Sequence, residues 1–73
     1  MERVKRLIIN RESIGFFKAI LESYEEVGLM TVIDGRTGEI ELVYPAAAET
    51  DLAAIMEDMK RFDIVFTEAT DVR

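Results

Sequence analysis

The sequence contains no cysteine and no histidine, and these two absences narrow its chemistry more than any motif does. Disulfides are excluded, and so are the usual metal sites built from thiolates and imidazoles. The commonest general base and the most reactive nucleophile are missing too, which would leave catalysis to Asp, Glu, Ser or Lys side chains. We therefore expect a domain that is not an enzyme and that uses no metal and no cofactor.

The chain has 73 residues, which is enough for one domain spanning residues 1–73. A domain this small buries a core only just large enough to keep it folded, so association with a partner would add useful support. No apolar run approaches the length needed to cross a bilayer, and no signal-peptide pattern opens the chain. We expect a cytoplasmic protein that does not enter a membrane.

Acidic residues outnumber basic residues by 15 to 9, which gives a formal net charge of −6. This balance argues against binding to nucleic acids, whose phosphates attract basic proteins. An RNA-binding sheet of the RRM type would also need aromatic side chains on its first strand, where this chain has none. A local basic patch remains open near the start, where Arg3, Lys5, Arg6 and Arg11 lie close together in sequence.

Hydrophobic periodicity divides the chain into four strand-like and two helical segments. The strand-like segments are residues 3–10, 29–34, 39–44 and 64–67, and the helical segments are residues 12–27 and 49–62. Asn10 is expected to cap the first helix, and Gly28 to follow it in a left-handed conformation.

The resulting order, β-α-β-β-α-β, is that of an α+β ferredoxin-like domain. Right-handed crossovers place both helices on one face of a four-stranded antiparallel sheet, with the strand order 4-1-3-2. The other face of the sheet is then left without helices. Its side chains are the best functional clue in the sequence.

The stretch GRTG, from Gly35 to Gly38, resembles two known binding loops in its spacing. A KH-type clamp joins two helices, whereas this stretch has strand periodicity on both sides. A phosphate loop needs a longer spacing and a following helix. Glycines supply the positive φ that a tight turn requires, so GRTG is predicted to be a plain hairpin with Gly38 left-handed.

The uncovered face is predicted to bind a second copy of the chain. Alternation places Ile40, Leu42 and Tyr44 inward, and Glu41 and Val43 outward. The preceding strand offers either Met30 and Val32 or Thr31 and Ile33 to the same face, and the hairpin register decides which. The predicted interface residues are Met30, Val32, Glu41 and Val43. A homo-oligomer would pack through this face or through the edge of the sheet, whereas the alternative is a mixed face that is simply solvated.

A second hypothesis places a small molecule or anion at the start of the first helix. Asn10, Arg11 and Ser13 precede or open this helix, whose positive end attracts anions. Acylphosphatase-type enzymes of the same topology use an Asn and an Arg in this way, but their glycine-rich loop is missing here.

Two further clusters have plain structural explanations. Glu22, Glu25 and Glu26 could hold a hard cation, but a solvated helix face is favoured. Phe16 and Phe17 lie about 100° apart around the helix, and placement of both in the core is favoured over an exposed edge position for one of them.

Taken whole, the chain resembles a family of short uncharacterised bacterial proteins. The resemblance rests on the IGFFKAILESYE helix, the VIDGRTGEIELVYP hairpin and the acidic start of the second helix. That family implies no activity. In fold the chain is also similar to ACT-type regulatory domains, which pair through sheets or helices and bind small effectors. The ACT ligand loop usually contains glycine, whereas Gly15 lies inside the expected helix here, and fold alone does not imply function.

Overall fold

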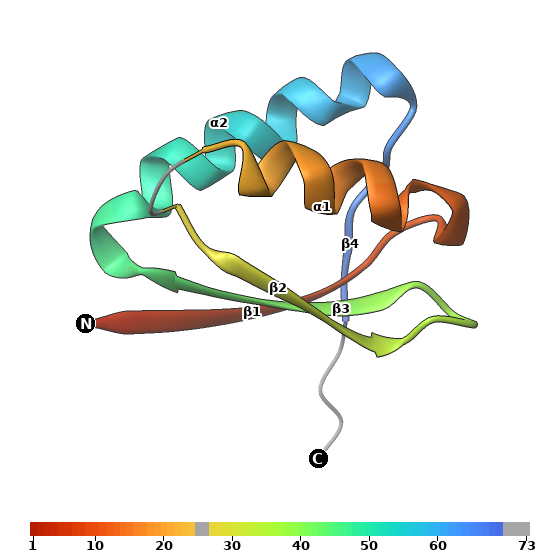
Figure 1. The fold of residues 1–73 in the computed structure, drawn as a ribbon, viewed down its shortest axis with the longest axis horizontal. Helices are drawn as coiled ribbons and strands as arrows, with labels where there is room; N and C mark the ends of the chain where they lie inside the picture. Colours follow the sequence, from red (N-terminus) through yellow and green to blue (C-terminus); the bar gives the residue numbers. More distant parts are fainter. Residues whose placement is uncertain (25–26, 70–73) are drawn as a thin grey trace.

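Four strands form one antiparallel sheet, and two helices cross one of its faces (Figure 1). The computed structural model describes residues 1–24 and 27–69. Its elements are β1 (Glu2–Ile8), η1 (Arg11–Ser13), α1 (Ile14–Glu22), β2 (Leu29–Asp34), β3 (Glu39–Pro45), η2 (Ala46–Ala48), α2 (Glu49–Met59), η3 (Lys60–Phe62) and β4 (Thr67–Glu68). The sheet order is β2-β3-β1-β4, which is the predicted order taken from the opposite edge, and the ferredoxin-like fold class is confirmed.

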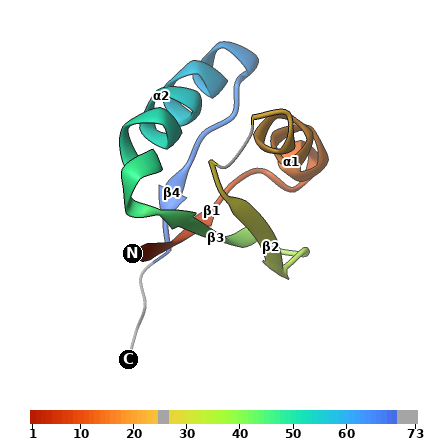
Figure 2. The same ribbon diagram turned by 60° about the vertical axis from the view of Figure 1, so that its left-hand side comes forward.

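The two helices cover different halves of the sheet, α1 on the side of β2 and α2 on the side of β4 (Figure 2). On β3, the three inward residues Ile40, Leu42 and Tyr44 are buried, while the residues between them are only half-buried. Each fully buried side chain of this size stabilises the fold by roughly 1.5–3 kcal/mol. The core cluster consists of Leu7, Ile9, Phe17, Leu21, Val27, Ile40, Leu42, Tyr44, Leu52, Ile55, Met59 and Ile64.

The first helix is shorter than its apolar stripe predicts. It ends at Glu22, and the Ser23 hydroxyl donates a hydrogen bond of 2.6 Å to the carbonyl oxygen of Ile20. Hydroxyls that bond the preceding turn compete with the helical backbone and favour helix ends. The predicted last turn falls partly on residues 25–26, which lie outside the described residues.

Gly28 is required, but not for the reason that the sequence suggested. Its φ is not positive, so the left-handed helix end predicted there is wrong. Instead the chain passes close over β3 at this point. A Cβ atom on Gly28 would lie 3.0 Å from the Cβ of Tyr44 and 3.1 Å from the carbonyl oxygen of Val43. Close backbone approach, rather than backbone conformation, explains the glycine.

The last strand has two residues, Thr67 and Glu68, and begins later than predicted. The segment before it still contributes to the core. Ile64 is fully buried, and the Phe66 ring packs edge-on against Phe17 with 5.0 Å between the ring centroids. Edge-to-face contacts of this kind are favourable for aromatic pairs.

The GRTG stretch forms the β2–β3 hairpin, as predicted. The Asp34 carboxylate accepts a hydrogen bond of 2.9 Å from the backbone N–H of Arg36, which holds the turn. Gly38 has a φ of +85°, so its left-handed conformation is confirmed. The Ile9 N–H donates a hydrogen bond of 2.9 Å to the Gly38 carbonyl oxygen, and therefore the hairpin is attached to the chain leaving β1.

Three side chains join β1, β3 and α2 at the other end of the sheet. The buried Tyr44 donates a hydrogen bond of 3.1 Å from its hydroxyl to Oε1 of Glu49. Arg3 lies 3.6 Å from the same carboxylate oxygen. The pKa of Tyr44 is raised, first by burial and then by its interaction with Glu49.

We expect Gly38→Ala to destabilise the fold by about 3 kcal/mol, because it combines a left-handed alanine with a severe overlap. A Cβ at this position would lie 1.9 Å from the Ile9 carbonyl oxygen, which is backbone and cannot turn aside. Urea unfolding measures the loss. Gly35→Ala is the matched control in the same loop, since its nearest neighbour is the Val32 Cγ1 at 3.9 Å. Equal losses in the two variants would contradict the role given to Gly38.

Tyr44→Phe should cost about 1 kcal/mol at neutral pH, and this difference should shrink in alkali. The folded protein holds the Tyr44 proton more tightly than the unfolded chain does. The stabilisation is therefore complete below the ordinary tyrosine pKa of about 10 and is lost as the pH rises towards the raised value. Urea unfolding across this alkaline range, with Tyr24→Phe as the matched substitution, measures the effect. A difference that stays constant with pH would show that Tyr44 does not contribute to the alkaline loss.

Candidate interaction surface

The face of the sheet opposite the helices bears an apolar row across three strands. Residues opposite each other in an antiparallel pair point to the same face, and here Val4 lies opposite Val43, which in turn lies opposite Leu29. Val4 is 62% exposed and Leu29 is 73% exposed. We call this face the open face, and this set the apolar row.

The next positions along the open face are charged and paired with each other. The Arg6 guanidinium donates hydrogen bonds of 3.2 Å to Glu41 and 3.4 Å to Glu39, both on β3. The pKa of Arg6 is raised, first by the hydrogen bond to Glu41, against some lowering by desolvation and with further support from Glu39. Arg6 thus balances part of the acidic charge on this face, and the apolar row lies beside paired charges.

The strand pairing shows which residues of β3 and β2 share the open face. On β3, Glu41 and Val43 lie there, as predicted, because their neighbours Ile40 and Leu42 are buried beneath the helices. Thr31 lies opposite Glu41 and therefore belongs to the same face.

Placing Met30 and Val32 on the open face is wrong. They lie opposite Leu42 and Ile40, on the side of the sheet that the helices cover. The physical reason is the hairpin, whose register shifts by one residue between Val32 and Asp34. Such a bulge is invisible to simple alternation, and one residue of slip exchanges the two faces of a strand.

β2 is unusually exposed for a strand with this composition. It forms one edge of the sheet, and its outer side has no partner strand among residues 1–24 and 27–69. Ile33 is 42% exposed, and Val32 is 43% exposed although it lies on the helix-covered side. A homo-oligomer joined through the edge of the sheet was predicted, but no residues were assigned to that edge. The run LMTVI, uninterrupted by charge, was the available signal.

The three residues proposed to bind an anion adopt different roles. The Asn10 side chain donates a hydrogen bond of 2.8 Å to the Ser13 hydroxyl, so these two groups satisfy each other. Asn10 precedes η1, but its side chain makes no hydrogen bond to the helix backbone, and the expected side-chain cap is therefore absent. Arg11 is exposed and lines a shallow hollow with Glu12 and Gly35. An anion site here stays a prediction.

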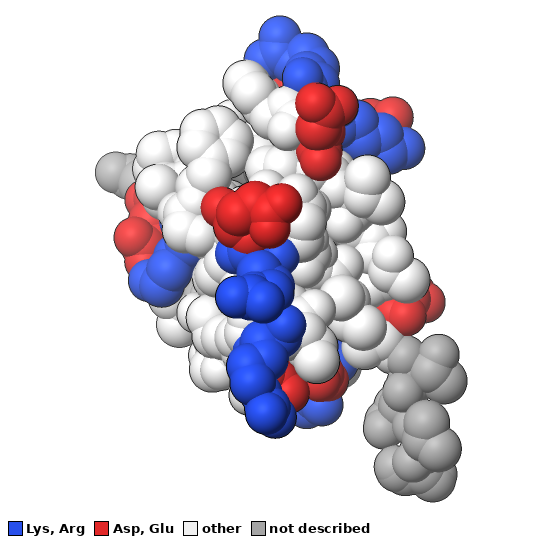
Figure 3. All heavy atoms as spheres, turned by 90° about the vertical axis from the view of Figure 1, so that its right-hand side faces the viewer, with Lys and Arg blue, Asp and Glu red and all other residues white. Residues whose placement is uncertain are grey.

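The end of the molecule that bears this hollow carries acidic side chains among its basic ones (Figure 3). Arg36, at the hairpin turn, is 91% exposed and lies 3.6 Å from Asp34. Elsewhere, Arg3 and Arg6 have acidic partners. Two of the four basic residues near the start of the chain, Arg3 and Arg6, are thus engaged in ion pairs.

One phenylalanine of the first helix is exposed, contrary to the expectation that both are in the core. Phe17 is completely buried, whereas Phe16 is 43% exposed. The Phe16 ring packs edge-on against Phe62 of η3, with 5.2 Å between centroids. The pair joins the two helical segments at the surface.

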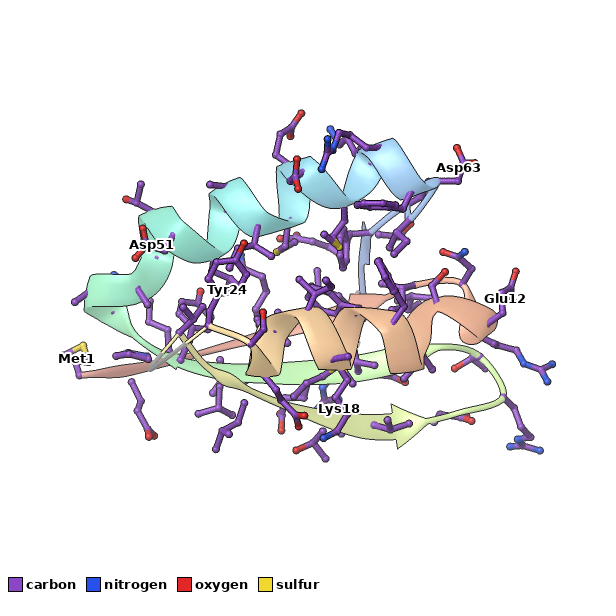
Figure 4. All side chains as sticks on the ribbon, turned by 45° about the horizontal axis from the view of Figure 1, so that its top comes forward. Met1, Glu12, Lys18, Tyr24, Asp51 and Asp63 are labelled. Atoms are coloured by element: carbon purple, nitrogen blue, oxygen red, sulfur yellow. The ribbon has the colours of Figure 1, made fainter. Side chains whose placement is uncertain are left out.

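Tyr24 lies outside the first helix, although residues 12–27 were predicted to be helical. It follows the end of α1 and is half-exposed. It lies between the helices on the side of Asp51, and both residues line a groove that also includes Asp58 (Figure 4). The early helix end, signalled by Ser23, was the clue to its position.

Metal binding has little support in the described part of the chain. Residues 1–24 and 27–69 contain no group of three acidic side chains arranged to hold an ion. Glu22 pairs with Lys18 instead, while Glu25 and Glu26 lie outside the described residues. Within the described ranges, no helix has both the length and the apolar character needed to cross a membrane.

Comparison with known proteins gives a family but no activity. A family model described as "Domain of unknown function (DUF4911)" matches residues 7–62, in agreement with the resemblance to a short uncharacterised family. No curated protein and no solved structure matches the chain. Since the matched stretch covers well over half of the 73 residues, the chain belongs to the DUF4911 family of unknown function.

Proposed function

We propose that this domain is a non-catalytic interaction or regulatory module that acts by associating with itself. The observation that supports this most directly is the exposure of β2 and of the apolar row that begins on it. Leu29, Val32 and Ile33 are each more than 40% exposed in a strand that has no charged residue before Asp34. Apolar surface that is contiguous and uncovered is typical of protein interfaces.

The size of the domain strengthens this proposal. A chain of 73 residues has little core to spare, and burial against a second copy would add apolar contacts that one copy cannot make alone. The ion pairs of Arg6 with Glu39 and Glu41 lower the repulsion that the acidic residues of two copies would otherwise meet on the open face.

The proposal assigns no catalytic residue. The chain has neither histidine nor cysteine, and the side chains of Asn10 and Ser13, just before α1, are hydrogen-bonded to each other. The sequence has no cysteine and therefore no disulfide, which is in keeping with the cytoplasmic setting that we propose for the domain.

Sedimentation equilibrium of the wild-type chain tests this proposal. We expect the average mass to rise from that of one copy towards that of two copies between low and high micromolar concentration. Light scattering at the same concentrations provides an independent measure of mass. A chain that remains a single copy at high micromolar concentration would remove self-association as its function.

A further inference from the structure

We propose that β2 pairs with β2 of a second copy, antiparallel and centred on Thr31, so that two sheets join into one. This inference rests on the proposed function and specifies which contact makes the association. It commits to the edge of the sheet over stacking of two open faces.

The edge formed by β2 lacks the features that normally prevent pairing. Exposed edge strands are usually protected by a lysine, a proline or an inward charge. The run from Leu29 to Ile33 contains none of these. Its outer backbone groups have no strand partner among residues 1–24 and 27–69, so they are free to form a further ladder. In contrast, β1 pairs with the two-residue β4 only at Leu7 and Ile8, and the rest of β1 carries the charged residues Glu2, Arg3, Lys5 and Arg6.

The occupant is a second copy because the run is symmetric in character about Thr31. An antiparallel pair with a two-fold axis at Thr31 places Met30 opposite Val32 of the partner copy, and Leu29 opposite Ile33. Each cross-strand pair is then apolar, and the central pair is Thr with Thr, which is favourable across antiparallel strands. No charged residue meets its own copy within the run.

The ends of the run fit the same register. Asp34 is the first charged residue after it, and the two-fold axis places Asp34 opposite Gly28 of the partner copy. Gly28 has no side chain, so the carboxylate meets neither a like charge nor an apolar group there. If the two-fold axis lay one residue later in the sequence, at Val32, Asp34 would instead lie opposite Met30 of the partner copy.

Both faces of the joined sheet gain apolar contacts in this arrangement. On the open face, the apolar row of Val4, Val43 and Leu29 continues onto Ile33 of the second copy. On the covered side, Met30 and Val32 extend the helix-covered layer, and α1 lies over β2 in each copy (Figure 2). The 43% exposure of Val32, otherwise unexpected on that side, is reduced by Met30 of the second copy.

Disulfide trapping tests the position of the two-fold axis directly. Opposed residues in antiparallel strands have Cα atoms about 4.5–5.5 Å apart, which suits a disulfide. Since the wild-type chain has no cysteine, Thr31→Cys introduces the sole thiol of each copy. We expect mild oxidation to convert most of Thr31→Cys to a covalent dimer, at least tenfold faster than Val65→Cys. Val65 is the matched control, because it is 65% exposed and precedes β4 at the opposite edge.

Cysteines at the outer pair test the register. An equimolar mixture of Leu29→Cys and Ile33→Cys should crosslink at least tenfold faster than either variant alone. Equal rates in the mixture and in the separate variants, or a Thr31→Cys chain that crosslinks no faster than Val65→Cys, would overturn the proposed pairing.

Charged substitutions distinguish edge pairing from stacking of open faces. Val32→Lys places a charge at the edge on the covered side, and Val4→Lys places one on the open face two strands away. Val65→Lys is the control, since it adds the same charge away from both surfaces. We expect Val32→Lys to raise the dimer dissociation constant at least tenfold, with Val65→Lys close to wild type, in sedimentation of variants shown by circular dichroism to be folded. A wild-type dimer that survives Val32→Lys but is lost in Val4→Lys would overturn edge pairing and leave self-association intact. A wild-type chain that never dimerises would overturn both proposals.

Discussion

The contact between Gly38 and Ile9 fixes much of what this domain presents to its surroundings. The Ile9 N–H bonds the Gly38 carbonyl oxygen where β1 ends and β3 begins, next to the seven-residue register of these two central strands. Only a glycine leaves room for the Ile9 carbonyl at this point. Because the hairpin is held here, the register of β2 follows from its turn. The composition of the open face follows from that register.

A short core has a further effect on the surface. Leu7 on β1 and the inward residues of β3 are buried beneath the helices, whereas β2 lies at the margin and keeps apolar side chains exposed on both of its sides. The nine-residue helix α1 buries its own Phe17 and Leu21 against the sheet but leaves Val32 on β2 exposed. An incomplete second layer over an edge strand is thus built into the length of the first helix.

Alternation and helical periodicity were sufficient to predict the fold, including the strand order and the inward face of β3. They failed where tertiary contacts overrode local preference. Gly28 was recognised as necessary, but the close approach of Tyr44 lies 16 positions away in sequence and leaves no local trace. The bulge before Asp34 moved Met30 and Val32 to the covered side, and no two-residue pattern reveals a bulge. Asn10 is a residue type that often caps helices, yet its side-chain amide donates its hydrogen bond to the Ser13 hydroxyl instead.

The hairpin has one further consequence, which concerns insertions and deletions. Its two ends are held, Asp34 by the Arg36 N–H and Gly38 by Ile9, while Arg36 between them is almost fully exposed. Substitutions at the tip of the hairpin should therefore have little effect on the rest of the molecule. A change in the number of residues between Asp34 and Gly38 is different. It would slide β2 along β3 and turn Leu29 and Thr31 towards the helices. We therefore expect the number of residues in this loop to be restricted more strongly than the identity of its side chains.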